Sequence, residues 1–238
     1  DLRMSRGLGD VYKRQVMETG FLDDEAIDAA LWIGMPGSRG CGSLGNILAG
    51  EVNPSGHLAD TYAYDLTTAP SYYNFGDYTY SNFDGNNKYV YYQEGIYVGY
   101  RYYETAAADG YIDYDTTVQF PFGYGLSYTN FDWEVEKTEL GDIGGTINID
   151  VKVTNTGDVA GKDVVELYYA APYDPAEEIE KSSVVLGAFE KTNTLKPGES
   201  ETVTLTMNVD DMASYDYKNN KCYVLSAVSY THLTLPTI

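Results

Sequence analysis

The sequence predicts a mixed fold, in which the remnant of an α/β layer is followed by an antiparallel β-sandwich. After about residue 126, apolar and polar residues alternate between regular turn signals, which is typical of half-buried antiparallel strands. Before about residue 70, a short apolar run, a glycine-rich loop and a helix-like segment make one βα unit. Residues 120–131 (FPFGYGLSYTNF) set glycines among aromatic rings between the two regions, and we interpret them as the hinge between domains.

The sandwich follows from runs of strand length that have no helical period. These runs lie at residues 147–153, 165–169, 184–189 and 203–209. NTGD at 155–158 and LKPGE at 195–199 are turn signals between them. Strands of this length between such turns predict a β-sandwich of about 100 residues.

The α/β part contains a single unit. Residues 29–33 (AALWI) predict a buried strand that ends at Gly34 and Pro36. A loop is expected at 37–42 and a short helix at 43–50, ending at a glycine. One unit cannot bury both faces of its own strand, so the rest of the sheet must come from elsewhere.

The glycine-rich loop contains a literal G-x-G-x-x-G at Gly40, Gly42 and Gly45. Between a strand and a helix this pattern is the context of a dinucleotide site. The loop begins several residues after the predicted strand, however, and Asp60 and Asp65 follow no clear second strand. Glycines that permit a tight turn and close helix packing are the preferred interpretation.

Composition limits the classes of partner. The chain has 238 residues and a formal net charge of −21, so binding to nucleic acid or to an anionic membrane is not expected. No apolar run is long enough to cross a bilayer. Cys41 and Cys222 lie far apart without metal-type spacing. No metal site, disulfide framework or cofactor is expected.

Both ends of the chain depart from the rest. Residues 1–15 (DLRMSRGLGDVYKRQ) lack strand and helix periodicity and the apolar core of a signal peptide. Residues 226–238, which close with SYTHLTLPTI, follow a strand-like run without a turn signal. Both resemble translated adapter sequence from bacterial metagenomic contigs, so we expect non-native tails on a fragment. Ordinary disordered termini are the alternative.

Aromatic residues concentrate before the hinge. Residues 62–128 hold 17 of the 25 tyrosines. Such a stretch can present rings and hydroxyls to a sugar, but its composition favours a connector at a domain interface. Residues 82–86 (NFDGN) have some features of a calcium loop, yet the bidentate glutamate is missing, so a plain loop is expected.

Six short motifs occur in a characteristic order. They are LWIG at 31–34 with the glycine loop, GEVNPSG at 50–56, EGIYVGYRYY at 94–103, FPFGYGLSY at 120–128, VTNTG at 153–157 and LKPGE at 195–199. Each motif is weak alone, but together they resemble the C-terminal half of a glycoside hydrolase family 3 enzyme. The resemblance runs from about residue 16 to residue 225.

The resemblance, together with the two unusual ends, divides the chain into five segments. Residues 1–15 are a tail, 16–70 the C-terminal part of an α/β-sandwich domain, and 71–125 a tyrosine-rich connector. Residues 126–225 are then an immunoglobulin-like sandwich of the fibronectin type III type, and 226–238 a second tail. The family's last strand has no counterpart after residue 225, so an exposed sheet edge that pairs with another copy is expected.

The family's activity is implied only for a longer protein. Its members are retaining glycosidases, chiefly β-glucosidases and β-xylosidases, which use one carboxylate as nucleophile and another as acid/base. The family nucleophile belongs to a TIM-barrel domain, and the acid/base glutamate lies before the equivalent of residue 16. The resemblance therefore places no catalytic residue in this chain, which alone should be inactive, and it identifies no substrate-binding residue.

Four other residues are candidates on their chemistry. Glu94, among aromatic residues, is the acid best placed for a raised pKa, although a hydrogen bond to the neighbouring turns is the preferred role. Arg101 is expected to stack or pair at the domain interface. His57 stands where the family commonly has arginine and is expected on the surface or in packing. His232 lies in the second tail.

Two rival functions differ in class from a glycosidase fragment. One is a non-catalytic carbohydrate-binding or cell-surface module, built on the sandwich. The other is a nucleotide-binding fragment that uses Gly40, Gly42 and Gly45. The expected partners are a carbohydrate substrate and a TIM-barrel domain in the full-length enzyme, and the location, cytoplasmic or secreted, stays open.

Overall fold

The computed structural model describes residues 16–34, 37–74, 78–79, 88–89, 92–226 and 233–234. The expectations for residues 1–15, for the loop at 82–86 and for His232 lie outside these residues. Among the described residues, no helix has the length and apolar character that crossing a bilayer requires.

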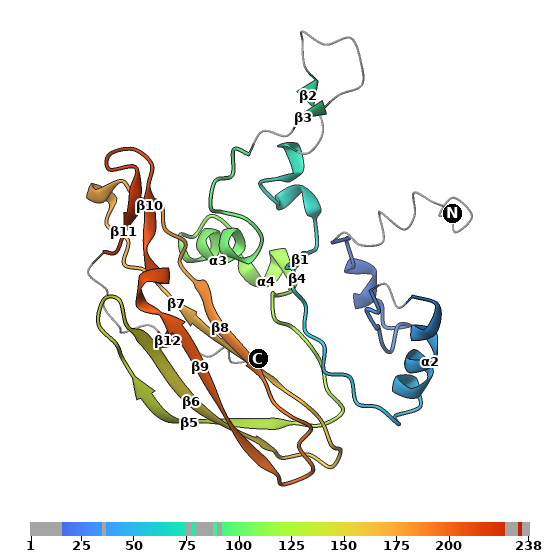
Figure 1. Cartoon of the computed structure of the whole chain (residues 1–238). Helices are drawn as coiled ribbons and strands as arrows, with labels where there is room; N and C mark the ends of the chain where they lie inside the picture. Colours follow the sequence, from blue (N-terminus) through green and yellow to red (C-terminus); the bar gives the residue numbers. More distant parts are fainter. Residues whose placement is uncertain are drawn as a thin grey trace.

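Two antiparallel sheets form a sandwich (Figure 1). The first sheet has the order β5 (Phe131–Glu139), β6 (Thr146–Asn155) and β9 (Ser200–Asn208). The second has the order β12 (Leu233–Thr234), β7 (Val164–Tyr169) and β8 (Val185–Lys191). The predicted antiparallel sandwich is confirmed. In the second tail, β12 pairs with Tyr168 and Tyr169 of β7.

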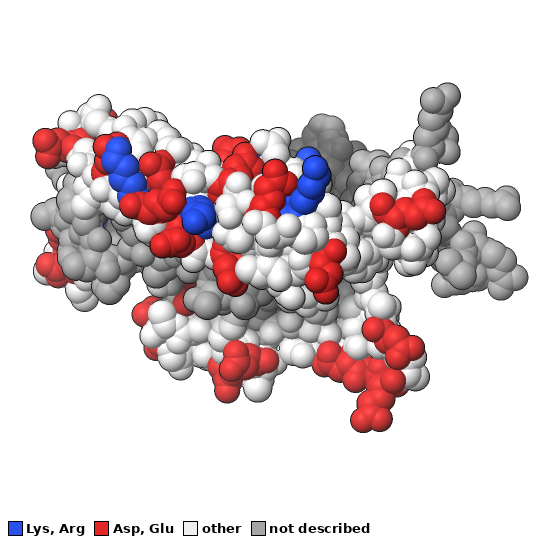
Figure 2. Space-filling model, turned by 90° about the horizontal axis from the view of Figure 1, so that it is seen from below, with Lys and Arg blue, Asp and Glu red and all other residues white. Residues whose placement is uncertain are grey.

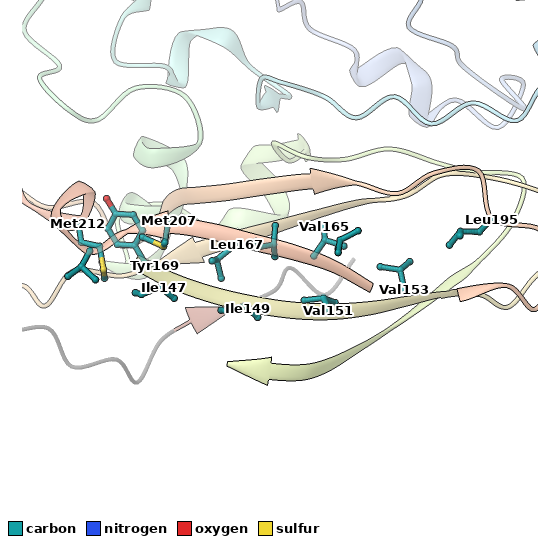
Figure 3. Close-up of a cluster of buried hydrophobic side chains, with 13 residues drawn as sticks. Ile147, Ile149, Val151, Val153, Val165, Leu167, Tyr169, Leu195, Met207 and Met212 are labelled. Atoms are coloured by element: carbon teal, nitrogen blue, oxygen red, sulfur yellow. The ribbon is translucent and has the colours of Figure 1, made fainter. Parts of the chain in front are cut away.

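The core lies between the sheets and follows the alternation of the sequence (Figure 3). Every second residue of β6 points inward, because successive side chains of a strand face opposite sides. The inward-facing residues of β7 and β9, and two residues of η5 (Val209–Met212), pack against these side chains of β6. The buried members are Ile147, Ile149, Val151, Val153, Val165, Leu167, Tyr169, Leu195, Val203, Leu205, Met207, Val209 and Met212.

The described part of the connector carries short elements. They are η3 (Tyr72–Asn74), β2 (Tyr78–Thr79), β3 (Lys88–Tyr89), α3 (Tyr100–Ala108), α4 (Tyr114–Thr117) and β4 (Val118–Phe120). Of these, α3 and α4 lie beside the second sheet, whereas β2 and β3 lie away from it (Figure 1). β4 pairs with β1 (Tyr62–Ala63), and β2 pairs with β3. A small core of Ala63, Tyr103 and Val118 fastens α3 to this ribbon.

The N-terminal part is the region where the prediction is wrong. Its elements are η1 (Gly20–Asp23), α2 (Gly37–Leu48) and η2 (Leu66–Thr68). Residues 29–33 form no strand, and the side chains of Leu31, Trp32 and Ile33 are 41–49% exposed. A strand needs neighbours for its backbone groups, and the described residues supply none to this segment.

The glycine-rich segment is helical rather than a loop. α2 begins at Gly37, so the expected loop at 37–42 forms its first half. The helix ends where predicted, because Gly50 follows it with φ of +75°, a conformation that glycine adopts without strain.

A hairpin at the far end of the sandwich depends on one buried carboxylate. β10 (Ser214–Asp216) pairs with β11 (Cys222–Val224). A short 3-10 helix, η4 (Pro175–Glu177), lies earlier in the chain, between β7 and β8. The Asp216 carboxylate accepts the backbone N–H groups of Asn219 and Asn220 at 2.9 Å, and that of Lys218 at 3.1 Å. These hydrogen bonds hold the pKa of Asp216 below its usual value, because they favour the ionised form.

Asp216 should therefore support folding only while it is ionised. Because its pKa is lower in the folded chain, its contribution is present above about pH 3.9 and is lost as the pH falls through the folded-state pKa. Asp216→Asn should lower the unfolding midpoint at pH 7 and flatten the acid loss of stability, measured by urea unfolding at several pH values. Asp28→Asn, at an exposed position, is the control. The same acid dependence in Asp216→Asn and the wild type would contradict this role.

Candidate functional site

A cavity of about 430 Å³ lies between the connector and the sandwich. α3 and α4, the loop at 121–124 and the strands β5 and β7 contribute to its walls. Six aromatic side chains line it: Tyr100, Tyr114, Phe122, Tyr124, Trp133 and Tyr168. Two carboxylates, those of Glu104 and Glu166, also line it. We call it the interface cavity.

β7 supplies the floor of the interface cavity. Val165 and Leu167 point into the sandwich core, so Glu166 and Tyr168, at the alternate positions, point to the opposite face. That face lies under the connector, and both residues are buried there. β7 is therefore covered on both sides, by the first sheet and by the connector.

Glu166 is held by a neighbouring tyrosine. Its side chain is 9% exposed, and Tyr168 Oη donates a hydrogen bond to Oε2 at 2.7 Å. Burial raises the pKa of Tyr168, and this hydrogen bond adds to the effect. The Tyr168 hydroxyl therefore remains a protonated donor to the carboxylate at physiological pH.

Gly123, in the FPFGYGLSY segment at 120–128 that we call the aromatic motif, makes room for this carboxylate. Its φ is +81°, and a Cβ atom there would lie 2.4 Å from Glu166 Oε2. A side chain would therefore be strained by the backbone and would also strike the glutamate. The motif needs glycine at this position because the loop passes directly over Glu166.

Glu104 repeats the arrangement on the connector side. Tyr114 Oη donates to Glu104 Oε1 at 2.6 Å, and burial together with this hydrogen bond raises the pKa of Tyr114. Among the residues that the structure describes, neither Glu104 nor Glu166 forms an ion pair with lysine, arginine or histidine.

Asn53 fastens the N-terminal part to the sandwich. Its Oδ1 accepts hydrogen bonds from Tyr128 N at 2.8 Å and from Ser127 Oγ at 3.1 Å. Its Nδ2 donates to the Ala160 carbonyl at 3.2 Å. Asn53 belongs to the NPSG turn and its partners to the aromatic motif and the sandwich, so two of the sequence motifs meet at this residue.

His57 lies at the same junction. Its Nε2 is 4.0 Å from Asp163 Oδ1, and its side chain is 14% exposed. Trp133 Nε1 donates to Asp163 Oδ2 at 2.7 Å. Burial raises the pKa of Asp163, although the hydrogen bond from Trp133 offsets part of the effect. The packing role expected for His57 agrees with this position.

The other predicted candidates lie away from the interface cavity or act as packing groups. Glu94 is in the turn before α3, where its carbonyl accepts Tyr97 N at 3.1 Å, and it does not line the cavity. The guanidinium carbon of Arg101 is 6.0 Å from the centre of the Tyr100 ring. Tyr100 Oη accepts Leu186 N of β8 at 2.9 Å, so the expected interface role of Arg101 agrees with the structure.

The glycine motif forms no nucleotide loop in this structure. Gly40, Gly42 and Gly45 lie inside α2. Apart from the backbone of α2 itself, no described atom lies within 4 Å of a Cβ built on Gly42 or Gly45, so the close packing expected of them is not seen either. The described residues also contain no group of three metal-binding side chains. Cys41 and Cys222 are both exposed and unpaired.

Sequence reasoning missed Glu104 and Glu166. The signal for Glu166 was a charged residue in the apolar run of residues 164–169 (VVELYY), which marks a strand face with a polar contact. Glu104 carries no comparable signal, because a glutamate on a nine-residue helix usually faces solvent.

Comparison with known proteins decides the family. Residues 11–100 match the model of the glycosyl hydrolase family 3 C-terminal domain, and residues 163–232 match that of the fibronectin type III-like domain. The chain belongs to glycosyl hydrolase family 3.

Relatives within this family are β-glucosidases. The chain is 40% identical over 201 residues to a β-glucosidase of Ruminococcus albus. The aligned region covers 84% of this chain and 19% of that protein. β-Glucosidase A of Butyrivibrio fibrisolvens is 41% identical over 211 residues, and the aligned region covers 83% of this chain and 24% of that protein. The chain thus spans about a fifth of the length of the curated relatives it matches.

A solved structure agrees in fold. The β-glucosidase of Paenibacillus barengoltzii superposes with a TM-score of 0.67 at 40% identity, covering 84% of this chain and 21% of that one. The family 3 resemblance drawn from the motifs is therefore confirmed, both in sequence and in fold.

Asn53→Ala should loosen the junction between the N-terminal part and the sandwich. The Tyr128 N–H loses its acceptor, so its hydrogen-exchange protection should fall about tenfold, equivalent to about 1.4 kcal/mol. Asn130→Ala is the matched control, since Asn130 is exposed and close to Tyr128. Unchanged protection of Tyr128 in Asn53→Ala would show that this side chain does not hold the junction.

Proposed function

We propose that this chain is part of a retaining glycoside hydrolase of the β-glucosidase or β-xylosidase type, in which it acts as a scaffold. The observation that carries the proposal is identity of about 40% to β-glucosidases over more than four fifths of the chain. The six motifs occur in family order across the same stretch.

In this proposal the chemistry belongs to residues of the full-length enzyme outside these 238 residues. A retaining glycosidase needs two carboxylates about 5–5.5 Å apart, one as nucleophile and one as acid/base. The family places the nucleophile in a TIM-barrel domain, and that domain would be the principal partner of this chain, with a carbohydrate as substrate.

The scaffold role divides the chain as the motifs suggest. Residues 16–70 would complete an α/β-sandwich domain, 71–125 would connect it, and 126–225 would form the supporting sandwich. Two features support this division. The apolar segment at 29–33 is exposed, as a strand without its sheet would be. Asn53 fixes the first part to the last through three hydrogen bonds.

The chain alone should not hydrolyse p-nitrophenyl β-glucoside or β-xyloside, because neither family carboxylate is present. Release of p-nitrophenol should equal that of a buffer blank, in the wild type and in Glu94→Gln alike. Turnover by the wild type that disappears in Glu94→Gln would overturn the assignment of the chemistry to other residues.

The scaffold role can be tested with a chimera. The region of the Ruminococcus albus β-glucosidase that matches this chain is replaced by residues 16–225, and the same enzyme without that region serves as control. The chimera should hydrolyse the aryl glucoside, whereas the shortened enzyme should not. A chimera that is soluble and melts cooperatively but remains inactive would contradict the proposal.

A further inference from the structure

The interface cavity has an unusual electrostatic composition. Glu104 and Glu166 line it, and no lysine, arginine or histidine is among its lining residues. Glu166 is more than nine-tenths buried, and its Oε1 atom accepts no hydrogen bond from any described residue. The chain as a whole carries a net charge of −21, and acidic side chains outnumber basic ones on the face in Figure 2.

We propose that the interface cavity binds a small organic ammonium ion, with the ammonium group between Glu104 and Glu166. A carboxylate removed from water is stabilised by a cation or by several donors. Each of these glutamates lines the cavity and receives one tyrosine hydroxyl, which leaves further acceptor capacity on each carboxylate. An anion is disfavoured, because nothing in the lining would balance its charge.

The aromatic lining favours the same class of ligand. A cation near the faces of tyrosine, phenylalanine and tryptophan rings is attracted by their quadrupoles, and more strongly when it is desolvated. Tyr100, which is 4.7 Å from Phe122 and 6.0 Å from Tyr168 between ring centres, joins the rings of α3, the loop and β7. The volume of about 430 Å³ lies within the range of small-molecule sites, about 300–1,000 Å³.

The nearest arginine on the connector does not fill this role. The Arg101 guanidinium lies by the Tyr100 ring and donates from Nε to Tyr100 Oη at 3.4 Å. It is absent from the residues that line the cavity. Among the described residues that line the cavity, none carries a basic side chain that would balance its negative charge.

Three probes separate charge from shape. Cyclohexylammonium is the cationic probe, cyclohexanol its neutral counterpart of the same size, and glucose the neutral sugar. Trp133 lines the cavity and the only other tryptophan is Trp32. Fluorescence of the full chain in a Trp32→Phe background thus reports the cavity directly. Cyclohexylammonium should change Trp133 emission with a saturable, millimolar Kd, and cyclohexanol should bind at least tenfold more weakly.

Variants locate the binding. Glu166→Gln and Glu104→Gln keep the side-chain shape and remove one charge each, and each should raise the Kd of cyclohexylammonium about tenfold. Glu25→Gln removes one charge at an exposed, distant position and should leave the Kd within twofold. If Glu166→Gln does not fold, Glu104→Gln and the wild-type salt dependence decide, since added NaCl should weaken binding severalfold.

The opposite results would overturn the inference. Equal binding of cyclohexanol, tighter binding of glucose, no saturable signal at 50 mM cyclohexylammonium, or equal effects of Glu25→Gln and Glu104→Gln would each do so. These outcomes leave the glycosidase scaffold untouched, because the chimera measures hydrolysis and not cavity binding.

Discussion

The structure depends on burying both faces of β7. Val165, Leu167 and Tyr169 enter the sandwich core, while Glu166 and Tyr168 face the connector. A strand covered on one side only would leave these two side chains in water and α3 without a surface to pack on. Their burial fixes the position of the connector, and with it the interface cavity. The part of the connector from α3 to the loop at 121–124 is thus packed on the sandwich and is more than a link between domains.

The motifs that identify the family serve this arrangement. In the aromatic motif, Gly123 lets the chain pass over Glu166, and Tyr128 gives its backbone N–H to Asn53 of the NPSG turn. Gly125 allows equally close approach, since a Cβ there would lie 2.5 Å from the Gly56 carbonyl. The glycines therefore mark close backbone crossings between segments that lie far apart in sequence. The first hypothesis, a hinge between domains, understates how tightly this stretch is packed.

The sequence was sufficient for the sandwich and insufficient for the layer before it. Alternation along β6 and β9 is local information, because one residue in two must face the core. The apolar run at 29–33 is as clear a signal as the alternation in β6, but a strand forms only by hydrogen bonding to a neighbouring strand. Among the described residues, no strand lies beside this segment. The segment at 37–42 is helical although its glycines disfavour a helix, so nothing in its local sequence predicts this half of α2. Glu104 and Glu166 meet only through tertiary packing, which no spacing in the sequence indicates.

The most direct test of the central claim is hydrogen exchange in Gly123→Ala. If the connector is held by its passage over Glu166, exchange in α3 should become at least tenfold faster, while the β6 amides keep wild-type protection. The double variant Gly123→Ala/Glu166→Ala should recover part of the α3 protection, because the clash with the carboxylate is removed. Wild-type exchange in α3 of Gly123→Ala, or equal loss of protection in α3 and β6, would contradict the claim.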